Sequence, residues 1–349
     1  MEADKSNQMA LIINPRSYQA VEDHKRWPQR FPSWLAAAHE LLPGNYVVPS
    51  HDHSIAMIGG DEPRCVSNIC THKKATILKG RGILKSVLTC PIHKWTWDLN
   101  GKIRGARGFE KTCEMDLEQK SIHTWQGHVF GGGTSWQDDI DRLGDLAKWL
   151  DITGYRWHSG SRLSYGFDWK IFMEIFLDLY HVAPFHPGLR SLTDCSTFDW
   201  AFGNHWSCQT AKFNRSWPNE PGYQELYKLY QKTGHYDTAV YGAVWLGIYP
   251  NIMIEYYPGS IVVSTVWPDG SGRCVNHLDF YYEDGLLDKL PEFPDVFQRT
   301  FMTTADEDEE IGLRMQEGLS LTRTPFVSMN HQVEEAGYQH FHRWLQNYL

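Results

Sequence analysis

Residues 70–72 read Cys-Thr-His, and residues 90–101 read Cys-Pro-Ile-His-Lys-Trp-Thr-Trp-Asp-Leu-Asn-Gly. Each of these two segments offers one thiolate and one imidazole, and the four side chains are Cys70, His72, Cys90 and His93. Zinc sites usually draw their ligands from Cys-x(2–4)-Cys and His-x(3–5)-His segments, and a Cys-x-His pair does not follow that pattern. The spacing therefore predicts a metal centre that combines unlike ligands, with structural zinc as the alternative.

Two cysteines on one iron and two histidines on a second iron, bridged by sulfide, form a Rieske [2Fe–2S] cluster. The two quoted segments closely resemble the Rieske family, and the resemblance implies that their cysteines and histidines bind such a cluster. The chain departs from many relatives after each histidine, because it has Lys73-Lys74 and Lys94 where they have Arg-Gly and Gly. Positive charge there would tune the cluster or dock an acidic donor, and a solvated loop is the alternative. We expect the nearby Cys65 to be a buried strand residue rather than a further ligand.

The second candidate site lies on a helix predicted over residues 169–182. Lys170, Glu174, Asp178 and His181 recur at spacings of four, four and three, which places them on one face, opposite an apolar stripe. Pro184 breaks this helix before His186, so that a turn can bring both histidines to one metal. Two histidines and a carboxylate make the facial triad of non-haem Fe(II) oxygenases, and two interior hydrogen-bonded histidines are the alternative.

Taken together, the two constellations resemble the catalytic α subunit of the Rieske non-haem iron oxygenases of the aromatic-ring-hydroxylating type, over most of the chain. The resemblance assigns His181 and His186 to a mononuclear iron. It assigns Asp178 to a link between this iron and a Rieske histidine of a neighbouring subunit. Many relatives have asparagine at the position of Ile175, so no side-chain amide approaches the iron there.

The third iron ligand is expected from later sequence. In the family, a carboxylate stands eight residues before a glutamine in a segment that resembles Glu-Asp-(x)7-Gln-x-Gly-Leu. Asp308 stands eight residues before Gln316 and is therefore the predicted ligand, with Asp306 as the alternative.

The predicted fold class is α+β. Short strands with turn signals predict an all-β Rieske module over residues 45–150, and residues 1–44 are expected to form a helical segment that packs on the catalytic domain. Residues 151–349 are expected to form that domain, and the resemblance implies a helix-grip, START-like fold for it. Strands are predicted over 240–249, 251–257, 260–267 and 275–283, and closing helices over 308–319 and 333–349.

Composition narrows the functional class. The formal charge is −9 without strong basic clusters, which disfavours nucleic acid as a partner. The most apolar stretch, residues 241–267, is interrupted by Pro250, Glu255 and Pro258 and cannot be a membrane span. Seven cysteines at irregular spacing in a chain without a signal-peptide core argue against a disulfide framework. These features predict a cytoplasmic protein.

The resemblance implies a terminal oxygenase that uses dioxygen to hydroxylate or oxidatively demethylate a small organic substrate. No Gly-x-Gly-x-x-Gly motif is present, so NAD(P)H would act only through a separate reductase or ferredoxin. The substrate classes left open are an aromatic compound, a quaternary ammonium and a biosynthetic intermediate. Electron transfer between chains implies a ring-shaped homo-oligomer, most simply a homotrimer, without excluding a β subunit. A Rieske electron carrier with a non-catalytic ligand-binding domain is the alternative function.

Overall fold

The computed structural model describes residues 11–19, 27–109 and 115–348. These residues divide into two compact units. The small unit comprises residues 27–109, 115–134 and 151–153, and the large unit comprises residues 11–19, 135–150 and 154–348. The predicted boundaries at 44/45 and 150/151 are therefore displaced, and each unit is described by itself below.

The small unit consists mainly of short antiparallel strands, as predicted. Its first sheet has the order β10 (Gln119–Lys120), β5 (Arg64–Ser67), β4 (Ile55–Ile58), β3 (Asn45–Val47), β6 (Arg81–Ile83). Its other sheets are β11 (Ile122–Trp125), β12 (His128–Gly132), β2 (Pro32–Ala37) and β7 (Val87–Thr89), β8 (Thr96–Asp98), β9 (Ile103–Gly105). Two short helices, α1 (Trp27–Arg30) and η4 (Ala38–Glu40), flank β2 in the chain.

The register of β2 explains why the boundary at 44/45 was wrong. β2 pairs with β12 from Pro32 opposite Gly132 to Ala37 opposite His128. Its pairing partner lies almost a hundred residues away, so a local reading of residues 1–44 as helical could not detect it. The remaining described part of that segment, residues 11–19, belongs to the large unit, and residues 1–10 and 20–26 lie outside the described residues.

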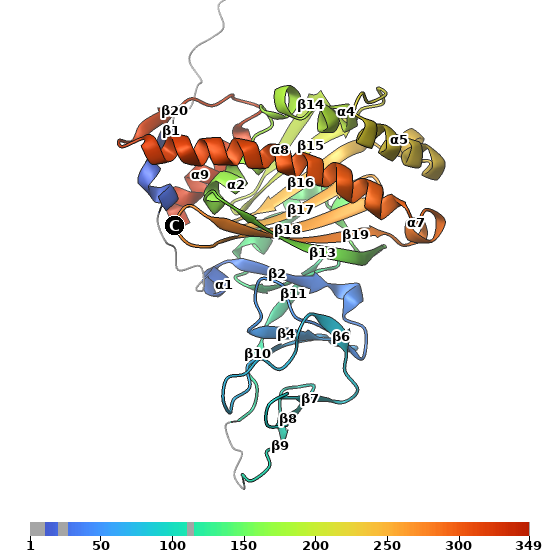
Figure 1. Ribbon diagram of the computed structural model, residues 1–349, viewed down its shortest axis with the longest axis vertical. Coiled ribbons are helices and arrows are strands. Elements are labelled where there is room, and N and C mark those ends of the chain that lie inside the picture. Colours follow the sequence, from blue (N-terminus) through green and yellow to red (C-terminus); the bar gives the residue numbers. More distant parts are fainter. Residues whose placement is uncertain (1–10, 20–26, 110–114, 349) are drawn as a thin grey trace, which may run out of the picture. The chain divides into compact units, whose positions relative to one another are not determined.

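The large unit contains a seven-stranded antiparallel sheet (Figure 1). Its order is β13 (Tyr155–Tyr165), β19 (Cys274–Glu283), β18 (Ser260–Pro268), β17 (Ile252–Tyr257), β16 (Tyr241–Ile248), β15 (Trp206–Phe213), β14 (Thr193–Phe202). The predicted run of four consecutive strands is confirmed in β16 to β19. Pro258 and Gly259 connect β17 to β18, and the φ of 78° at Gly259 fits the glycine position of a type II turn.

Both faces of this sheet are covered. Nearly every residue from β16 to β19 is buried, although successive side chains point to opposite faces. Trp149 of the 3₁₀ helix η6 (Ile140–Leu150) packs edge-on against Tyr241 and Tyr256 on one face. Residues next to Tyr256 along β17 therefore point toward the other face, where the main helices lie.

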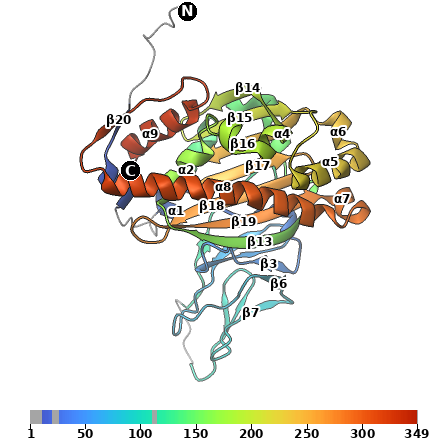
Figure 2. The ribbon, with the colours of Figure 1, turned by 45° about the horizontal axis from the view of Figure 1, so that its top comes forward.

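The helices of the large unit pack against the sheet and one another. They are α2 (Trp169–Phe176), α3 (Val182–Phe185), α4 (Pro187–Leu192), α5 (Pro221–Thr233), α6 (His235–Thr238), α7 (Asp284–Lys289), α8 (Phe293–Leu321), α9 (Ala336–Tyr348), with 3₁₀ helices η2 (Pro15–Gln19), η5 (Ser135–Asp138). β1 (Leu11–Ile13) pairs with β20 (Phe326–Ser328). Figures 1 and 2 show α8 running along the helix-covered face of the sheet, and the α+β class is confirmed.

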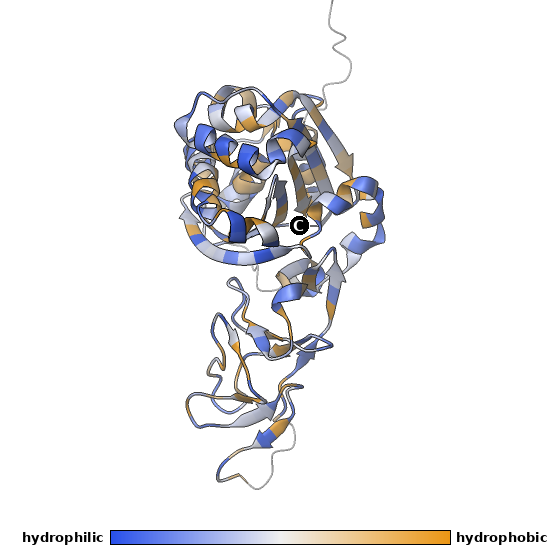
Figure 3. Cartoon of the chain, turned by 90° about the vertical axis from the view of Figure 1, so that its right-hand side faces the viewer, coloured by the Kyte–Doolittle hydropathy of each residue, from blue (hydrophilic) through white to orange (hydrophobic). Residues whose placement is uncertain are grey.

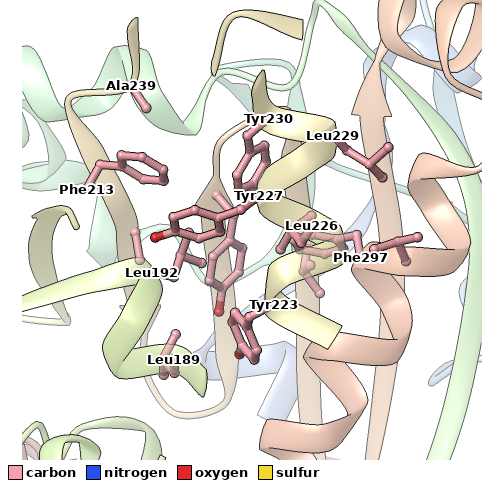
Figure 4. Packing of buried hydrophobic residues seen from close by; sticks show 14 of the residues in the cluster. Leu189, Leu192, Phe213, Tyr223, Leu226, Tyr227, Leu229, Tyr230, Ala239 and Phe297 are labelled. Carbon is pink, nitrogen blue, oxygen red and sulfur yellow. The ribbon is translucent and has the colours of Figure 1, made fainter. Parts of the chain in front are cut away.

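Aromatic side chains dominate the core between the sheet and α5. Figure 4 shows Tyr223, Tyr227 and Tyr230 of α5 beside Phe213 of β15 and Phe297 of α8. Figure 3 shows hydrophilic and hydrophobic residues mixed along the outer helices, as expected for helices with one face on a core. This packing fixes the position of α8 against the sheet. It therefore also fixes the position of the α8 residues described below.

The structure bears on two further predictions. Within the described part of the chain, no helix combines the length and hydrophobicity of a membrane span. The described cysteines are free thiols. Cys113 lies outside the described residues.

Candidate metal centres

The structure brings together His181, His186 and Asp308. Nε2 of His181 lies 3.1 Å from Nε2 of His186, and Oδ1 of Asp308 lies 2.9 Å from Nε2 of His186 and 3.4 Å from Nε2 of His181. These three side chains are the candidate metal-binding group found within the described residues. Asp306 is exposed and outside this group, so the geometry favours Asp308 over the alternative. Two imidazoles and one carboxylate that converge in this way match a facial triad.

The turn that brings the two histidines together comes earlier than predicted. α2 ends at Phe176 rather than continuing to residue 182, and Oδ1 of Asp178 accepts the backbone N–H of Tyr180 at 2.6 Å. Such a local side-chain bond competes with continued helix. Pro184 does not break a helix but lies in the short helix α3 between His181 and His186.

Two contacts fix α8, which carries Asp308, against the start of α2. The backbone N–H of Asp168, the N-cap of α2, donates to Oε1 of Gln316 at 2.8 Å. A Cβ at Gly312 would lie 2.5 Å from the ring of Phe167, so only glycine permits this close approach of α8. The glutamine eight residues after Asp308 therefore helps to position the carboxylate.

Each triad histidine has a second carboxylate beside its outer nitrogen. Oδ2 of Asp178 lies 3.1 Å from Nδ1 of His181, within ion-pair distance but at an angle that makes no regular hydrogen bond. Oε2 of Glu307 lies 2.7 Å from Nδ1 of His186. Burial would lower the pKa of His181, but Asp178 and Asp308 outweigh it and raise the pKa to about 9. Sequence reasoning missed Glu307, because neither spacing nor resemblance connects it with His186.

The rest of the predicted polar face of α2 does not reach the triad. Lys170 and Glu174 are buried elsewhere, with Lys170 Nζ 3.0 Å from Asp168 and Glu174 bonded by Tyr18 and by His342 at 2.8 Å. These contacts join α2 to η2 and α9. Of the four ionisable residues predicted on one face, Lys170 and Glu174 therefore have a structural role, whereas Asp178 and His181 lie at the candidate metal site.

In the small unit, the Cys70 and Cys90 loops have the same hydrogen-bond frame. The Cys70 N–H donates to the Ala75 carbonyl, and the Cys90 N–H donates to the Trp95 carbonyl, both at 2.8 Å. The rings of His72 and His93 lie 4.8 Å apart, and His72 stacks on Trp95 at 4.7 Å. Both cysteines are buried, whereas His93 is exposed. Nδ1 of His72 is buried without a hydrogen-bond partner, as suits a nitrogen that binds a metal.

The lysines that replace glycine in these loops take up an unusual backbone conformation. Lys74 and Lys94 have φ angles of 59° and 61°. Their N–H groups donate to the carbonyls of Cys70 and Cys90, respectively, which closes each loop. The left-handed conformation costs a residue other than glycine about 1–2 kcal/mol. Glycine at these positions would avoid this cost.

Comparison with known proteins decides the family. The family described as ring hydroxylating alpha subunit (catalytic domain) matches residues 152–349, and that described as Rieske [2Fe-2S] domain matches residues 33–120. The chain belongs to the Rieske non-haem iron oxygenase α subunits. The match from residue 33 agrees with the small unit's inclusion of β2, and the two domains imply a Rieske cluster and a mononuclear iron.

Individual relatives of this oxygenase have both similar sequences and similar folds. It is 37% identical to a putrescine 2-hydroxylase of Ralstonia nicotianae, over 81% of this chain and 79% of the relative. It is 25% identical to a carnitine monooxygenase oxygenase subunit of Escherichia coli, over 97% and 94%. A solved quaternary ammonium Rieske monooxygenase shares the fold with a TM-score of 0.74 at 20% identity, over 92% and 89% of the two chains.

A cavity of about 130 Å³ adjoins the triad. A cavity of about 150 Å³ in another protein holds benzene, so this one has room for a small organic molecule. Ile175, at the position where many relatives have asparagine, lines it. Two aromatic residues of the sheet, Trp245 and Tyr257, also line it. The arrangement therefore places a possible substrate site directly beside the three predicted iron ligands.

Proposed function

We propose that this chain is a terminal oxygenase that inserts oxygen into a small organic substrate at a mononuclear Fe(II) held by His181, His186 and Asp308. The observation that carries the proposal is the convergence of these three side chains, which also line a cavity. Bound there, iron would supply the oxidising chemistry with dioxygen, while the cavity walls orient the substrate and limit access of water.

We further propose that Cys70, Cys90, His72 and His93 hold the Rieske cluster, which supplies electrons. The matched hydrogen-bond frames of the two loops and the unpartnered Nδ1 of His72 support this assignment. A separate NAD(P)H-dependent reductase or ferredoxin would reduce the cluster, and the exposed ring of His93 would offer an entry point. A cytoplasmic location stays a prediction from the sequence.

The relatives favour monooxygenation over dihydroxylation. Their names, putrescine 2-hydroxylase and carnitine monooxygenase oxygenase subunit, describe reactions on compounds that contain nitrogen. They support hydroxylation of a small amine or ammonium compound more than attack on an aromatic ring.

Asp178 is proposed to link the two metal centres of neighbouring subunits in a homotrimer. Its Oδ1 is held by the Tyr180 N–H, which leaves Oδ2 beside His181, and its side chain remains 23% exposed. A partly exposed carboxylate can also accept a hydrogen bond from the partner subunit's cluster histidine. Asp178→Asn should therefore retain both metals but fail to reoxidise its reduced cluster when substrate and dioxygen are added. Single-turnover stopped-flow measures this directly, and reoxidation at the parent's rate would exclude the link.

Metal analysis tests the central proposal against a non-catalytic Rieske carrier. The oxygenase requires two irons and two labile sulfides for the cluster plus one iron for the triad. Two irons with two sulfides would indicate the carrier, and zinc without sulfide would contradict both functions. Oxygen uptake coupled to product formation, with a reductase supplied, completes the test.

A further inference from the structure

The cavity contains an acidic residue, Glu255, that has no part in the triad. Glu255 lies on β17, lines the cavity and is 7% exposed. Within the described residues, its one side-chain hydrogen bond comes from the hydroxyl of Tyr257 at 2.8 Å. One neutral donor is a poor exchange for the hydration that a carboxylate loses on burial, since buried charges are normally paired. Glu255 therefore lacks an adequate partner in the protein itself.

The groups around Glu255 are arranged to attract a cation. Nε1 of Trp245 donates to the Tyr257 hydroxyl at 2.9 Å, so this hydroxyl is oriented with its own proton toward Glu255. The two rings lie 6.2 Å apart and are inclined at 73°, and both line the cavity. Aromatic faces beside a carboxylate favour a positively charged group, and most strongly where water is excluded.

A second unused acceptor stands in the same row of the sheet. Gln209 pairs with Trp245, and Trp245 pairs with Glu255, so the three side chains point to the same face across β15, β16 and β17. Nε2 of Gln209 donates to the Phe176 carbonyl at 2.5 Å, which determines the orientation of the amide. Its Oε1 is buried without a partner. This wall of the cavity therefore offers acceptors to a ligand that carries N–H groups.

The charged residues that line the cavity also favour a positively charged ligand. Among its described lining residues are four carboxylates and no lysine or arginine, and the four are Asp178, Glu255, Asp308 and Glu309. Fe(II) at the triad would balance the charge of Asp308, whereas Glu255 is not one of the three predicted iron ligands and would have no cation of its own. An anionic ligand would meet repulsion here, and a neutral ligand would bring no charge partner for Glu255.

We propose that Glu255 binds the ammonium group of a primary or secondary aliphatic amine and so selects the substrate of this oxygenase. The ammonium N–H donates to the Glu255 carboxylate beside the faces of Trp245 and Tyr257, and the aliphatic part extends through the cavity toward the triad. Gln209 offers a further acceptor to N–H or O–H groups of the same molecule. The inference rests on the proposed function for the reaction, but on these cavity residues for the ligand.

Binding without turnover tests the proposal. Isothermal titration calorimetry under anaerobic conditions, on the iron-loaded oxygenase, compares n-butylamine with 1-butanol and with N,N,N-trimethylbutylammonium. The parent protein should bind the primary amine at least about tenfold more tightly than either other ligand, because only this ligand brings charge and N–H donors together. Glu255→Gln should remove this preference and leave 1-butanol binding nearly unchanged, and Glu255→Asp should restore part of it. Iron content and the visible cluster spectrum must match the parent in both variants.

Several results would overturn the assignment. They are equal affinity of the parent for the amine and the alcohol, no measurable binding of the amine, or an unchanged amine preference in Glu255→Gln. Loss of turnover in Glu255→Gln with the binding preference intact would mean that Glu255 delivers a proton, and would equally reject the proposal. Because the calorimetry contains neither dioxygen nor reductant, the binding results are independent of whether the protein oxidises its ligand in a separate turnover assay. A Glu255-dependent amine preference without any product would therefore contradict the proposed function and leave this inference standing.

Discussion

Replacing Glu255 by glutamine should stabilise the ligand-free protein, and increasingly so as the pH rises. Burial raises the pKa of Glu255 from 4.5 to about 8, Tyr257 opposes this rise with its hydrogen bond, and the charge of Asp308 adds to it. Between these two pH values the folded protein keeps a proton that the unfolded chain has lost. The free energy of unfolding therefore falls as the pH rises through this window and levels off above it.

The size of this effect follows from the two pKa values. Their difference corresponds to at most about 5 kcal/mol, at 1.36 kcal/mol for each pH unit. Water in the cavity will solvate part of the charge, so we expect about 2–3 kcal/mol. Glutamine keeps an acceptor for Tyr257 but does not titrate. Glu255→Gln should therefore melt close to the parent at pH 5 and about 5–10 °C higher above pH 8.

Calorimetric melting of the ligand-free, iron-loaded protein between pH 5 and 9 measures this difference. Glu317→Gln is the matched control, because Glu317 is exposed on α8 and its replacement should leave a pH-independent gap near zero. A gap between Glu255→Gln and the parent that does not change with pH would refute the reasoning. In the parent alone, n-butylamine should raise the melting temperature, since a ligand that binds only the folded state stabilises it.

Five further variants test the metal centres and the loops around them. Asp308→Ala should lose the mononuclear iron but keep the visible cluster spectrum, whereas Asp306→Ala should keep both, and iron and sulfide analysis distinguishes them. Glu307→Gln removes the charge beside a triad imidazole and should weaken iron retention about tenfold in a chelator competition, with unchanged retention as the contrary result. Lys94→Gly should relieve the left-handed backbone and stabilise the small unit by about 0.5–1 kcal/mol, whereas Lys73→Gly should destabilise it, and denaturant unfolding decides.

Much of this oxygenase could be read from local sequence. The two Cys/His segments are recognisable because each places its predicted ligands within four residues. Their prediction therefore does not depend on a correct prediction of the fold. The strands from residue 241 to 283 were predictable because turn residues such as Pro258 and Gly259 act locally. Asp308 was predicted from the family's eight-residue spacing to Gln316, and Gln316 accepts a hydrogen bond from the backbone N–H at the start of α2.

Only the tertiary structure decided which side chains meet. The helical spacing placed Lys170 and Glu174 on one face with His181, yet Glu174 is bonded by Tyr18 and His342 and Lys170 pairs with Asp168. The helix ends after Phe176, so Asp178 and His181 do not continue that face. In the sequence, Glu255 is merely one charge in an apolar strand. Cross-strand pairing places its side chain in a cavity, where the loss of hydration raises its pKa. Spacing along the chain, together with the family resemblance, thus predicted the metal ligands, whereas the partners of a buried charge depend on contacts between distant segments that spacing cannot encode.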